Sequence, residues 1–249
     1  MSGIAIVSVP ILPLHIVNAH ILIGGQGCVL VDAGLPGSEK KFEHLLRKHG
    51  LAWGDVRLIV VTHAHVDHAG SAARLRELSG APIAAHVGDL PHYLQKEPMT
   101  FCSTGGTAPL FLSSTGLIRE PYVPFTPDIL LDGDTPLALD PYGVPGHVQS
   151  TTGHTRGSLS VVLADGRALV GDLLASGLFI GGLIPNGRPR RPPFEDDPRE
   201  VARQLERLLD AGSSEFYVGH GWPLTSEQVR RHVHHLLGIS GALTHPLVS

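Results

Sequence analysis

Residues 62–70, THAHVDHAG, are the stretch from which both the fold and the chemistry of this chain can be inferred. Three imidazoles and one carboxylate fall between positions 63 and 68, directly after the apolar run LIVV at residues 58–61. The apolar run predicts a buried strand. The cluster then lies at the carboxyl end of that strand, where α/β sheets place their binding sites. The stretch therefore predicts an α/β fold with a polar site at the end of a strand.

The spacing of this cluster allows two metal sites. His63 and His65 lie two positions apart and project to the same side of an extended segment, so they can share one ion. Asp67 and His68 begin the next turn and can face a second ion. A polar loop with incidental histidines is the alternative, because the chain contains 16 histidines. Four ligand-type residues at this spacing after a strand favour the metal interpretation.

Length and composition exclude several classes of protein. With 249 residues the chain can bury a large core and fits one domain, residues 1–249. The net charge is -4 and charged residues make up 17%, so we expect no basic face for nucleic acid and no polybasic membrane patch. The apolar runs are shorter than the about 20 residues of a membrane span. Two cysteines, Cys28 and Cys102, predict no disulfide framework and fit a reducing, cytoplasmic compartment.

Hydrophobic periodicity predicts two β-rich halves, each followed by helices. The unit from residue 57 to residue 85 reads as strand, helix and strand, which implies a parallel crossover. The second half is predicted to begin at residue 129. Two packed sheets with helices outside would accommodate both halves. The predicted strands are residues 4–9, 16–23, 28–31, 57–61, 81–85, 129–131, 136–139, 159–163, 168–170 and 215–218, and the predicted helices are residues 38–49, 71–78, 87–95, 197–211 and 226–237.

Residues 96–128 are predicted to be an inserted lid. The segment is rich in Pro, Gly, Ser and Thr, but it also carries Phe101, Leu110 and Phe111 among many large apolar residues, too many for a solvated linker. A long connection of this kind in a compact domain is more often a lid or binding loop than slack chain. A small satellite core packed on the domain is the alternative, and the sequence leaves both interpretations open.

Three further strand ends carry a ligand-type side chain beside glycine. Glycine permits the sharp turns and close approaches that a crowded metal site needs. These residues are His154 in GHTRGS at 153–158, Asp172 in GD at 171–172 and His220 in GHG at 219–221. His147 also follows a glycine, but only His154 is followed by Thr, Gly and Ser at the expected places. Asp32 is either a hydrogen-bond partner of a metal ligand or a turn residue.

Together these motifs resemble those of the metallo-β-lactamase fold superfamily of metallohydrolases. The resemblance covers about residues 10 to 237 and implies an α/β fold of the αββα sandwich type, two mixed β-sheets packed face to face with helices outside. Zinc is the usual metal, and nitrogen and oxygen ligands without cysteine would also accept iron or manganese. The implied ligands are His63, His65 and His154 for the first ion, Asp67, His68 and His220 for the second, and Asp172 as the bridge between them.

The resemblance implies a metal-dependent hydrolase that attacks an ester, thioester, lactone or amide. Two divalent ions would hold a hydroxide between them near neutral pH and polarise the scissile carbonyl. Asp67 is the predicted catalytic residue, because it can orient that hydroxide or relay its proton. We expect a small-molecule substrate with an apolar acyl part. The oligomeric state stays open, and a homo-oligomer is compatible with the sequence.

Three alternatives are less consistent with the motifs. A persulfide dioxygenase of this superfamily needs a mononuclear iron site, whereas the second ligand set is complete here. Phosphodiesterase members usually add an exosite or a second domain, for which the chain has no length. A non-enzymatic scaffold would be expected to have lost ligands. The hydrolase subfamily stays open, because lactonases often carry a Tyr where this chain has Ala175 and the basic loop of thioesterases has only a loose counterpart at residues 181–188.

Overall fold

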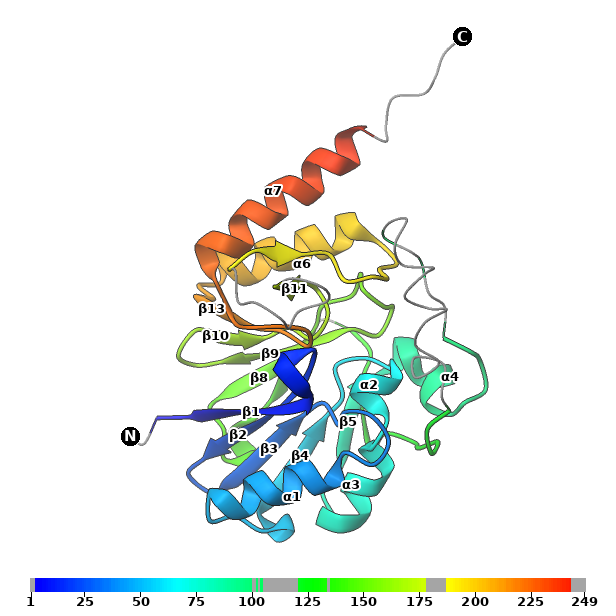
Figure 1. The fold of residues 1–249 in the computed structure, drawn as a ribbon, viewed down its shortest axis with the longest axis vertical. Coiled ribbons are helices and arrows are strands. Elements are labelled where there is room, and N and C mark those ends of the chain that lie inside the picture. Colours follow the sequence, from blue (N-terminus) through cyan, green and yellow to red (C-terminus); the bar gives the residue numbers. More distant parts are fainter. Residues whose placement is uncertain are drawn as a thin grey trace.

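Two six-stranded mixed β-sheets pack face to face, and helices cover their outer faces (Figure 1). This computed structural model describes residues 3–99, 102, 104, 121–133, 135–177 and 187–242, without the side chains of residues 239–242. Both sheets contain parallel and antiparallel pairs. The αββα sandwich predicted from the sequence is therefore confirmed.

The first sheet begins as an antiparallel meander and continues with parallel strands. Parallel strands run in the same direction, so their carboxyl ends meet at one edge of the sheet. The residues after these strands therefore lie side by side. In spatial order the strands are β1 (Ala5–Leu12), β2 (Val17–Gly24), β3 (Gly27–Val31), β4 (Val56–Val60), β5 (Ile83–His86) and β6 (Ile129–Leu131).

The second sheet is antiparallel except for one parallel pair, β10 with β13. That pair brings the residues after both strands to the same edge. A separate two-stranded ribbon, β11 (Ala175–Ser176) with β12 (Pro189–Arg190), follows β10. In spatial order the six strands are β14 (Leu224–Thr225), β13 (Glu215–Tyr217), β10 (Arg167–Leu169), β9 (Leu159–Leu163), β8 (Gly146–Ser150) and β7 (Leu137–Ala138).

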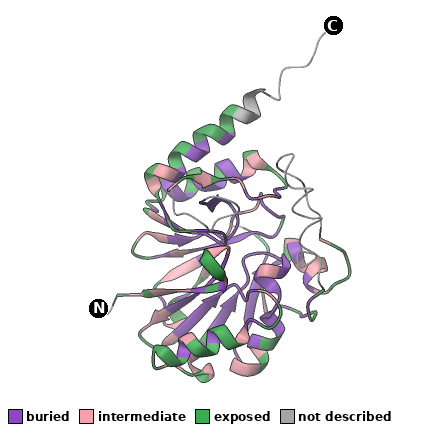
Figure 2. Ribbon diagram, viewed as in Figure 1, coloured by how far each residue is buried: buried purple, intermediate pink, exposed green. Residues whose placement is uncertain are grey.

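Alternating side chains on the strands fill three apolar cores. On β3, Val29 and Val31 face the second sheet, whereas Leu30 faces the helices outside the first sheet. Successive side chains of a strand point to opposite faces, so one apolar strand can supply two cores. The third core lies between the second sheet and its helices, where Phe216 contributes. Figure 2 shows buried residues along the strands and exposed residues on the outer side of the helices.

The helices close the outer faces of the two sheets. Helix α6 begins after Asp197, whose carboxylate accepts hydrogen bonds from the backbone N–H groups of Arg199 and Glu200 and so caps the helix. Ser38 stands at the corresponding position before α1, but its hydroxyl makes no capping bond. The helices are α1 (Glu39–Lys48), α2 (Val66–Ala69), α3 (Ala72–Ser79), α4 (Leu90–Tyr93), α6 (Pro198–Asp210) and α7 (Ser226–Ala242), and the 3-10 turns are Pro13–His15, Trp53–Asp55, Val87–Asp89 and Asp140–Tyr142.

The structure differs from the sequence prediction at several elements. Strand β6, which was predicted to begin the second half, pairs in parallel with β5 of the first sheet. Strand β8 was missed because its sequence, GHVQS, has only one large apolar residue. Asp67 and His68 lie in the separate short helix α2 and not at the start of the next helix. Helix α7 extends five residues beyond its predicted end at position 237.

The predicted lid falls mostly outside the described residues. Phe101, Leu110 and Phe111 belong to that part, so the structure does not test them. At the end of the segment, Tyr122 and Phe125 are buried, and the Phe125 ring packs on Tyr93 with ring centroids 5.2 Å apart. This described end of the segment is part of the first core.

The described residues also bear on the cysteines and on membrane insertion. Cys28 is buried, Cys102 is exposed, and both are free thiols. Within the described ranges, every helix is too short or too polar to span a membrane.

Candidate metal centre

The structure brings all seven predicted ligands together where the two sheets meet. The first sheet supplies His63 and His65 from the loop after β4, and Asp67 and His68 from α2. The second sheet supplies the other three. His154 precedes β9, Asp172 follows β10 and His220 follows β13. These last two residues are neighbours because β10 and β13 are parallel.

Three imidazole nitrogens form the first group. The His63 Nε2 atom lies 2.9 Å from His65 Nδ1, and His154 Nε2 lies 3.2 Å from both. An ion bound at about 2.0–2.1 Å in tetrahedral geometry separates its nitrogen ligands by about 3.3 Å. The observed triangle of nitrogens therefore has nearly the size that one common ion requires.

Asp67, His68 and His220 form the second group. The His220 Nε2 atom lies 3.4 Å from Asp67 Oδ2, and His68 Nε2 lies 3.9 Å from the same oxygen. The Asp67 side chain is 19% exposed, whereas the two imidazoles are at most 8% exposed. Asp67 is therefore the most exposed candidate ligand of this group.

Asp172 lies between the two groups. Its Oδ2 atom is 3.0 Å from His220 Nε2 and 3.8 Å from His154 Nε2, and its Oδ1 atom is 3.4 Å from His68 Nε2. A carboxylate has two oxygens and can bind one ion with each. Asp172 thus lies within reach of both groups, and its role as a bridge between two ions stays a prediction.

Hydrogen bonds fix the imidazole tautomers. The Thr62 hydroxyl donates its single proton to Asp32 Oδ2 at 3.0 Å. The same hydroxyl lies 3.0 Å from His63 Nδ1, and because it has no second proton, His63 Nδ1 must be the donor there. His68 Nδ1 lies 2.9 Å from Asp32 Oδ2, and His220 Nδ1 lies 2.5 Å from the Ile16 carbonyl oxygen. In each case Nδ1 carries a proton, so Nε2 is the nitrogen that can bind an ion at the centre.

Asp32 is thereby the partner of a candidate ligand and not only a turn residue. Its Oδ1 atom also accepts the Thr62 backbone N–H at 2.8 Å. Its φ angle of 64° lies in the left-handed region, which Asp tolerates better than most residues. Of the two interpretations open at the sequence level, the geometry favours the partner.

Burial and charge act in opposite directions in the two groups. Burial lowers the pKa of His65 and His154 to about 3 and that of His63 well below its usual value, despite the nearby Asp172. In the second group burial also favours the neutral form, but carboxylates, Asp172 foremost, outweigh it and raise the pKa of His68 to about 10 and of His220 to about 9. The first group therefore offers neutral nitrogen donors, and the second attracts positive charge.

Two unsatisfied atoms indicate what the centre accepts. Among the described residues, His68 Nε2 and Asp172 Oδ1 are buried without a hydrogen-bond partner. A buried polar atom without a partner costs free energy, so such atoms usually have a ligand or a catalytic role. Imidazole nitrogens and carboxylate oxygens are ligands of zinc and of other divalent transition metals. The residues present therefore fit divalent metal ions.

Asn18 was missed by the sequence analysis. Its side-chain amide donates to the carbonyl oxygens of Gly221 at 2.8 Å and Val218 at 3.3 Å, and so holds the loop that carries His220. These contacts use backbone groups 200 residues away in the chain, so no local pattern reveals them. His147, in contrast, lies on β8 with its Nε2 atom 3.0 Å from Gln149 Oε1 and belongs to neither metal group.

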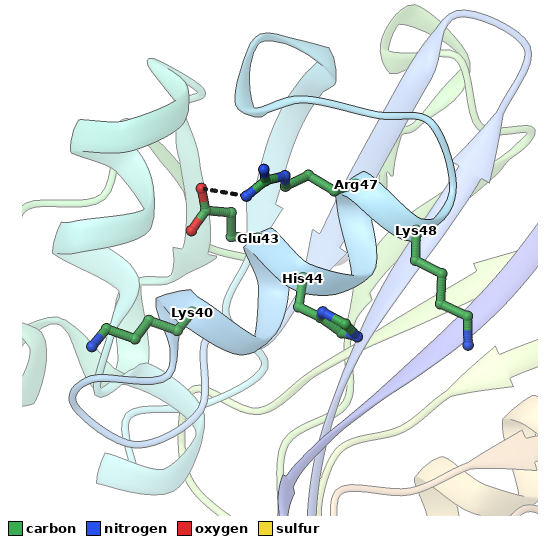
Figure 3. A pocket seen from close by; sticks show the side chains of 5 residues that line it. All are labelled: Lys40, Glu43, His44, Arg47 and Lys48. Atoms are coloured by element: carbon green, nitrogen blue, oxygen red, sulfur yellow. Dashed lines mark ion pairs between the residues drawn. The ribbon is translucent and has the colours of Figure 1, made fainter.

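The surface near His220 is apolar, whereas a hollow on helix α1 is lined by polar and charged side chains. Beside His220, the Trp222 ring packs on His15 with ring centroids 4.0 Å apart, and Trp222 and the neighbouring Leu14 keep apolar surface exposed. On α1, a surface hollow of about 340 Å³ is lined by charged and polar side chains of one helix face (Figure 3). None of the seven candidate ligands lines that hollow, so it is not the candidate site.

The fold and the site define a metallohydrolase-like protein, and comparison with known proteins identifies the family. The family model described as metallo-beta-lactamase superfamily matches residues 12–220, and the chain belongs to this family. The chain is 30% identical over 179 residues to YqgX of Bacillus subtilis, named a probable metallo-hydrolase, with 70% of this chain and 71% of that protein covered. It is 27% identical over 215 residues to YflN of the same organism, also named a probable metallo-hydrolase, with 81% and 78% covered.

Solved structures share the same fold. A metallo-beta-lactamase family protein from Thermus thermophilus superposes with a TM-score of 0.67 at 24% identity, and the match covers 98% of this chain and 82% of that protein. A metallo-beta-lactamase superfamily protein from Sulfolobus tokodaii gives a TM-score of 0.65 at 21% identity, with 95% and 87% covered. At these identities the likeness shows the fold alone.

Proposed function

We propose that this chain is a dinuclear metal-dependent hydrolase of a small-molecule ester, thioester, lactone or amide. The observation that carries the proposal is the position of Asp172 between two complete ligand groups, each built from three further side chains. Zinc is the metal we expect, because imidazole nitrogens and carboxylate oxygens are its common ligands; iron or manganese would accept the same set. Two divalent ions at such a site supply a hydroxide nucleophile near neutral pH and polarise the scissile carbonyl.

The residues of the chain divide the remaining work. His63, His65 and His154 present unprotonated nitrogens to the first ion because burial keeps them neutral. Asp67 is the one candidate ligand of the seven that is not fully buried, so its carboxylate is the group placed to orient the nucleophile and to accept its proton. Asp67 is therefore the proposed catalytic residue.

The surroundings of the centre support a substrate with an apolar acyl part. Leu14, 52% exposed, and Trp222, 36% exposed, place apolar surface beside the His220 loop. Small-molecule sites combine such apolar walls with a few placed polar groups. We propose residues 96–128 as a lid over the metal centre. We also expect the reaction to take place in the cytoplasm.

The test of this proposal is metal content combined with a substrate panel. Purified protein loaded with zinc should contain close to two equivalents per chain by elemental analysis, and His68→Ala should remove about one. His147→Ala is the matched control, because His147 lies on β8 outside both groups, and it should retain both equivalents. A panel of chromogenic esters, lactones, β-lactams and glutathione thioesters identifies the bond that is cleaved. A stoichiometry of one in fully loaded wild type would contradict the dinuclear site.

A further inference from the structure

Asp89 connects the two loops that supply the first group of candidate ligands. It ends the 3-10 turn Val87–Asp89 after β5, and it is 1% exposed. Its Oδ2 atom accepts the backbone N–H of Ala64 at 3.0 Å and the hydroxyl of Thr155 at 2.9 Å. Ala64 stands between His63 and His65, and Thr155 follows His154. One carboxylate oxygen therefore contacts the chain next to all three nitrogen ligands.

The backbone around this carboxylate is packed too closely to move independently. A Cβ atom added at Gly157 would lie 2.5 Å from Asp89 Cγ, and one added at Gly88 would collide with the carbonyl group of Arg156. Only glycine allows such close approach of two chain segments. The turn that carries Asp89 and the turn after His154 thus interlock.

The Ala64 peptide is held from its other side as well. The Tyr122 hydroxyl donates to the Ala64 carbonyl oxygen at 3.1 Å. With Asp89 on the N–H group and Tyr122 on the carbonyl group, both peptide planes between His63 and His65 have fixed partners. The separation of the two imidazoles in the first group depends on those planes.

We propose that Asp89 is a positioning residue for the first metal group, which sets the distance between the His63–His65 pair and His154. This inference rests on the proposed function, because it concerns the affinity of a metal site. The carboxylate does not reach the ligand nitrogens themselves. It acts by hydrogen bonds to Ala64 and Thr155, which hold the nitrogen triangle at 2.9 to 3.2 Å before an ion binds.

Two backgrounds separate the first group from the second. His220→Ala breaks the second group, so the zinc equivalent that remains is bound by the first. His154→Ala breaks the first group, so the zinc equivalent that remains is bound by the second. In the His220→Ala background, Asp89→Ala should weaken zinc binding by about 10- to 100-fold, the usual effect of removing a partner that orients metal ligands. In the His154→Ala background, the same change should leave zinc affinity within about twofold, because the two hydrogen bonds that Asp89 accepts end on Ala64 and Thr155, beside the first group.

The zinc affinities are measured on metal-free protein by competition with a chromogenic chelator, together with the melting temperature. Asp89→Asn should recover part of the loss, because its amide oxygen can still accept the Ala64 N–H group. Asp128→Ala is the matched control, since Asp128 Oδ2 likewise accepts a backbone N–H, that of Ile83 at 2.9 Å, away from the ligands.

The outcomes separate the two proposals. One outcome is that wild type binds two zinc ions but Asp89→Ala changes the zinc affinity in neither background. That result overturns the role of Asp89 and leaves the hydrolase proposal standing. Equal losses in both backgrounds, or the same zinc loss in Asp128→Ala at an equal fall in melting temperature, reduce Asp89 to a structural residue and overturn the inference. Wild type that binds no zinc overturns both proposals.

Discussion

Replacing Asp32 by Asn tests whether the second metal group depends on the tautomer of His68. The Asp32 carboxylate accepts three hydrogen bonds, from the Thr62 backbone N–H and hydroxyl and from His68 Nδ1, at 2.8 to 3.0 Å. Asn has the same shape and tolerates the φ angle of 64° found at this position. The substitution therefore changes the hydrogen-bonding chemistry and leaves the backbone unstrained.

The effect follows from the directions of the hydrogen bonds. In the Asp32→Asn variant the new amide oxygen must accept the Thr62 backbone N–H, and the NH₂ group then faces both His68 and the Thr62 hydroxyl. An NH₂ group donates, so His68 Nδ1 must accept and the neutral ring carries its proton on Nε2, the atom that faces the centre. Loss of such a partner usually costs about 10- to 100-fold in metal affinity, which corresponds to about 1.4 to 2.7 kcal/mol.

The assay is a zinc titration of metal-free protein against a chromogenic chelator. We expect Asp32→Asn to bind the zinc of the second group about 10- to 100-fold more weakly. The Thr62 hydroxyl, which loses its carboxylate acceptor, can then donate to His63 Nδ1 and weaken the first site as well. Asp140→Asn, a change at an exposed aspartate in another loop, serves as the control and should bind both as wild type does. Two equivalents of unchanged affinity in Asp32→Asn, with the His68 proton still on Nδ1 by nitrogen NMR, would refute the tautomer argument.

Three further predictions concern the bridge, acid stability and the lid. Asp172→Ala should release both zinc ions and reduce activity more than Asp32→Asn, because Asp172 contacts both groups; equal, small losses would make it a turn residue. Burial lowers the pKa of His20 from 6.5 to about 3. Between these two pH values His20 is protonated in the unfolded chain but not in the folded chain. The free energy of unfolding therefore decreases as the pH is lowered below 6.5, by up to about 1.4 kcal/mol per pH unit. Urea unfolding of metal-free protein at pH 7 and pH 5 should show a smaller difference for His20→Phe than for wild type, and an equal difference would contradict this. Phe101→Ala and Phe111→Ala should raise KM for substrates with long acyl groups while a minimal ester is turned over normally; a satellite core would instead lower the melting temperature, at about 2 to 5 kcal/mol for each truncation, and affect all substrates alike.

The sheets were predictable wherever local patterns decide them. The apolar run on β3 and the buried run before His63 mark strands by residue type alone. The sheet that β6 joins could not be predicted in the same way, because a three-residue strand carries no information about its neighbour. Strand β8 escaped because pairing with β7 and β9, and not its own composition, makes it a strand.

The candidate ligands were predictable because metal sites demand particular side chains at particular places. Histidine and aspartate at glycine-flanked strand ends satisfy that demand, and the structure brings these residues together. Asn18 and Asp89 were not predictable, because their partners are backbone groups of residues distant in the chain. Any residue type can present a backbone N–H or carbonyl group, so such contacts leave no pattern in a single sequence.

The centre also joins the two sheets. The Thr62 carbonyl oxygen in the ligand loop of the first sheet accepts the backbone N–H of Leu159 on β9 at 2.8 Å, and Asn18 on β2 donates its backbone N–H to the Gly219 carbonyl at 2.7 Å. These bonds hold the ligand loops of one sheet against the other, so the ligands gather only when the sandwich is packed. An ion that binds only the folded chain stabilises it, and the stabilisation grows with the logarithm of the ratio of the ion concentration to its dissociation constant. Metal binding and packing of the two sheets must therefore reinforce each other.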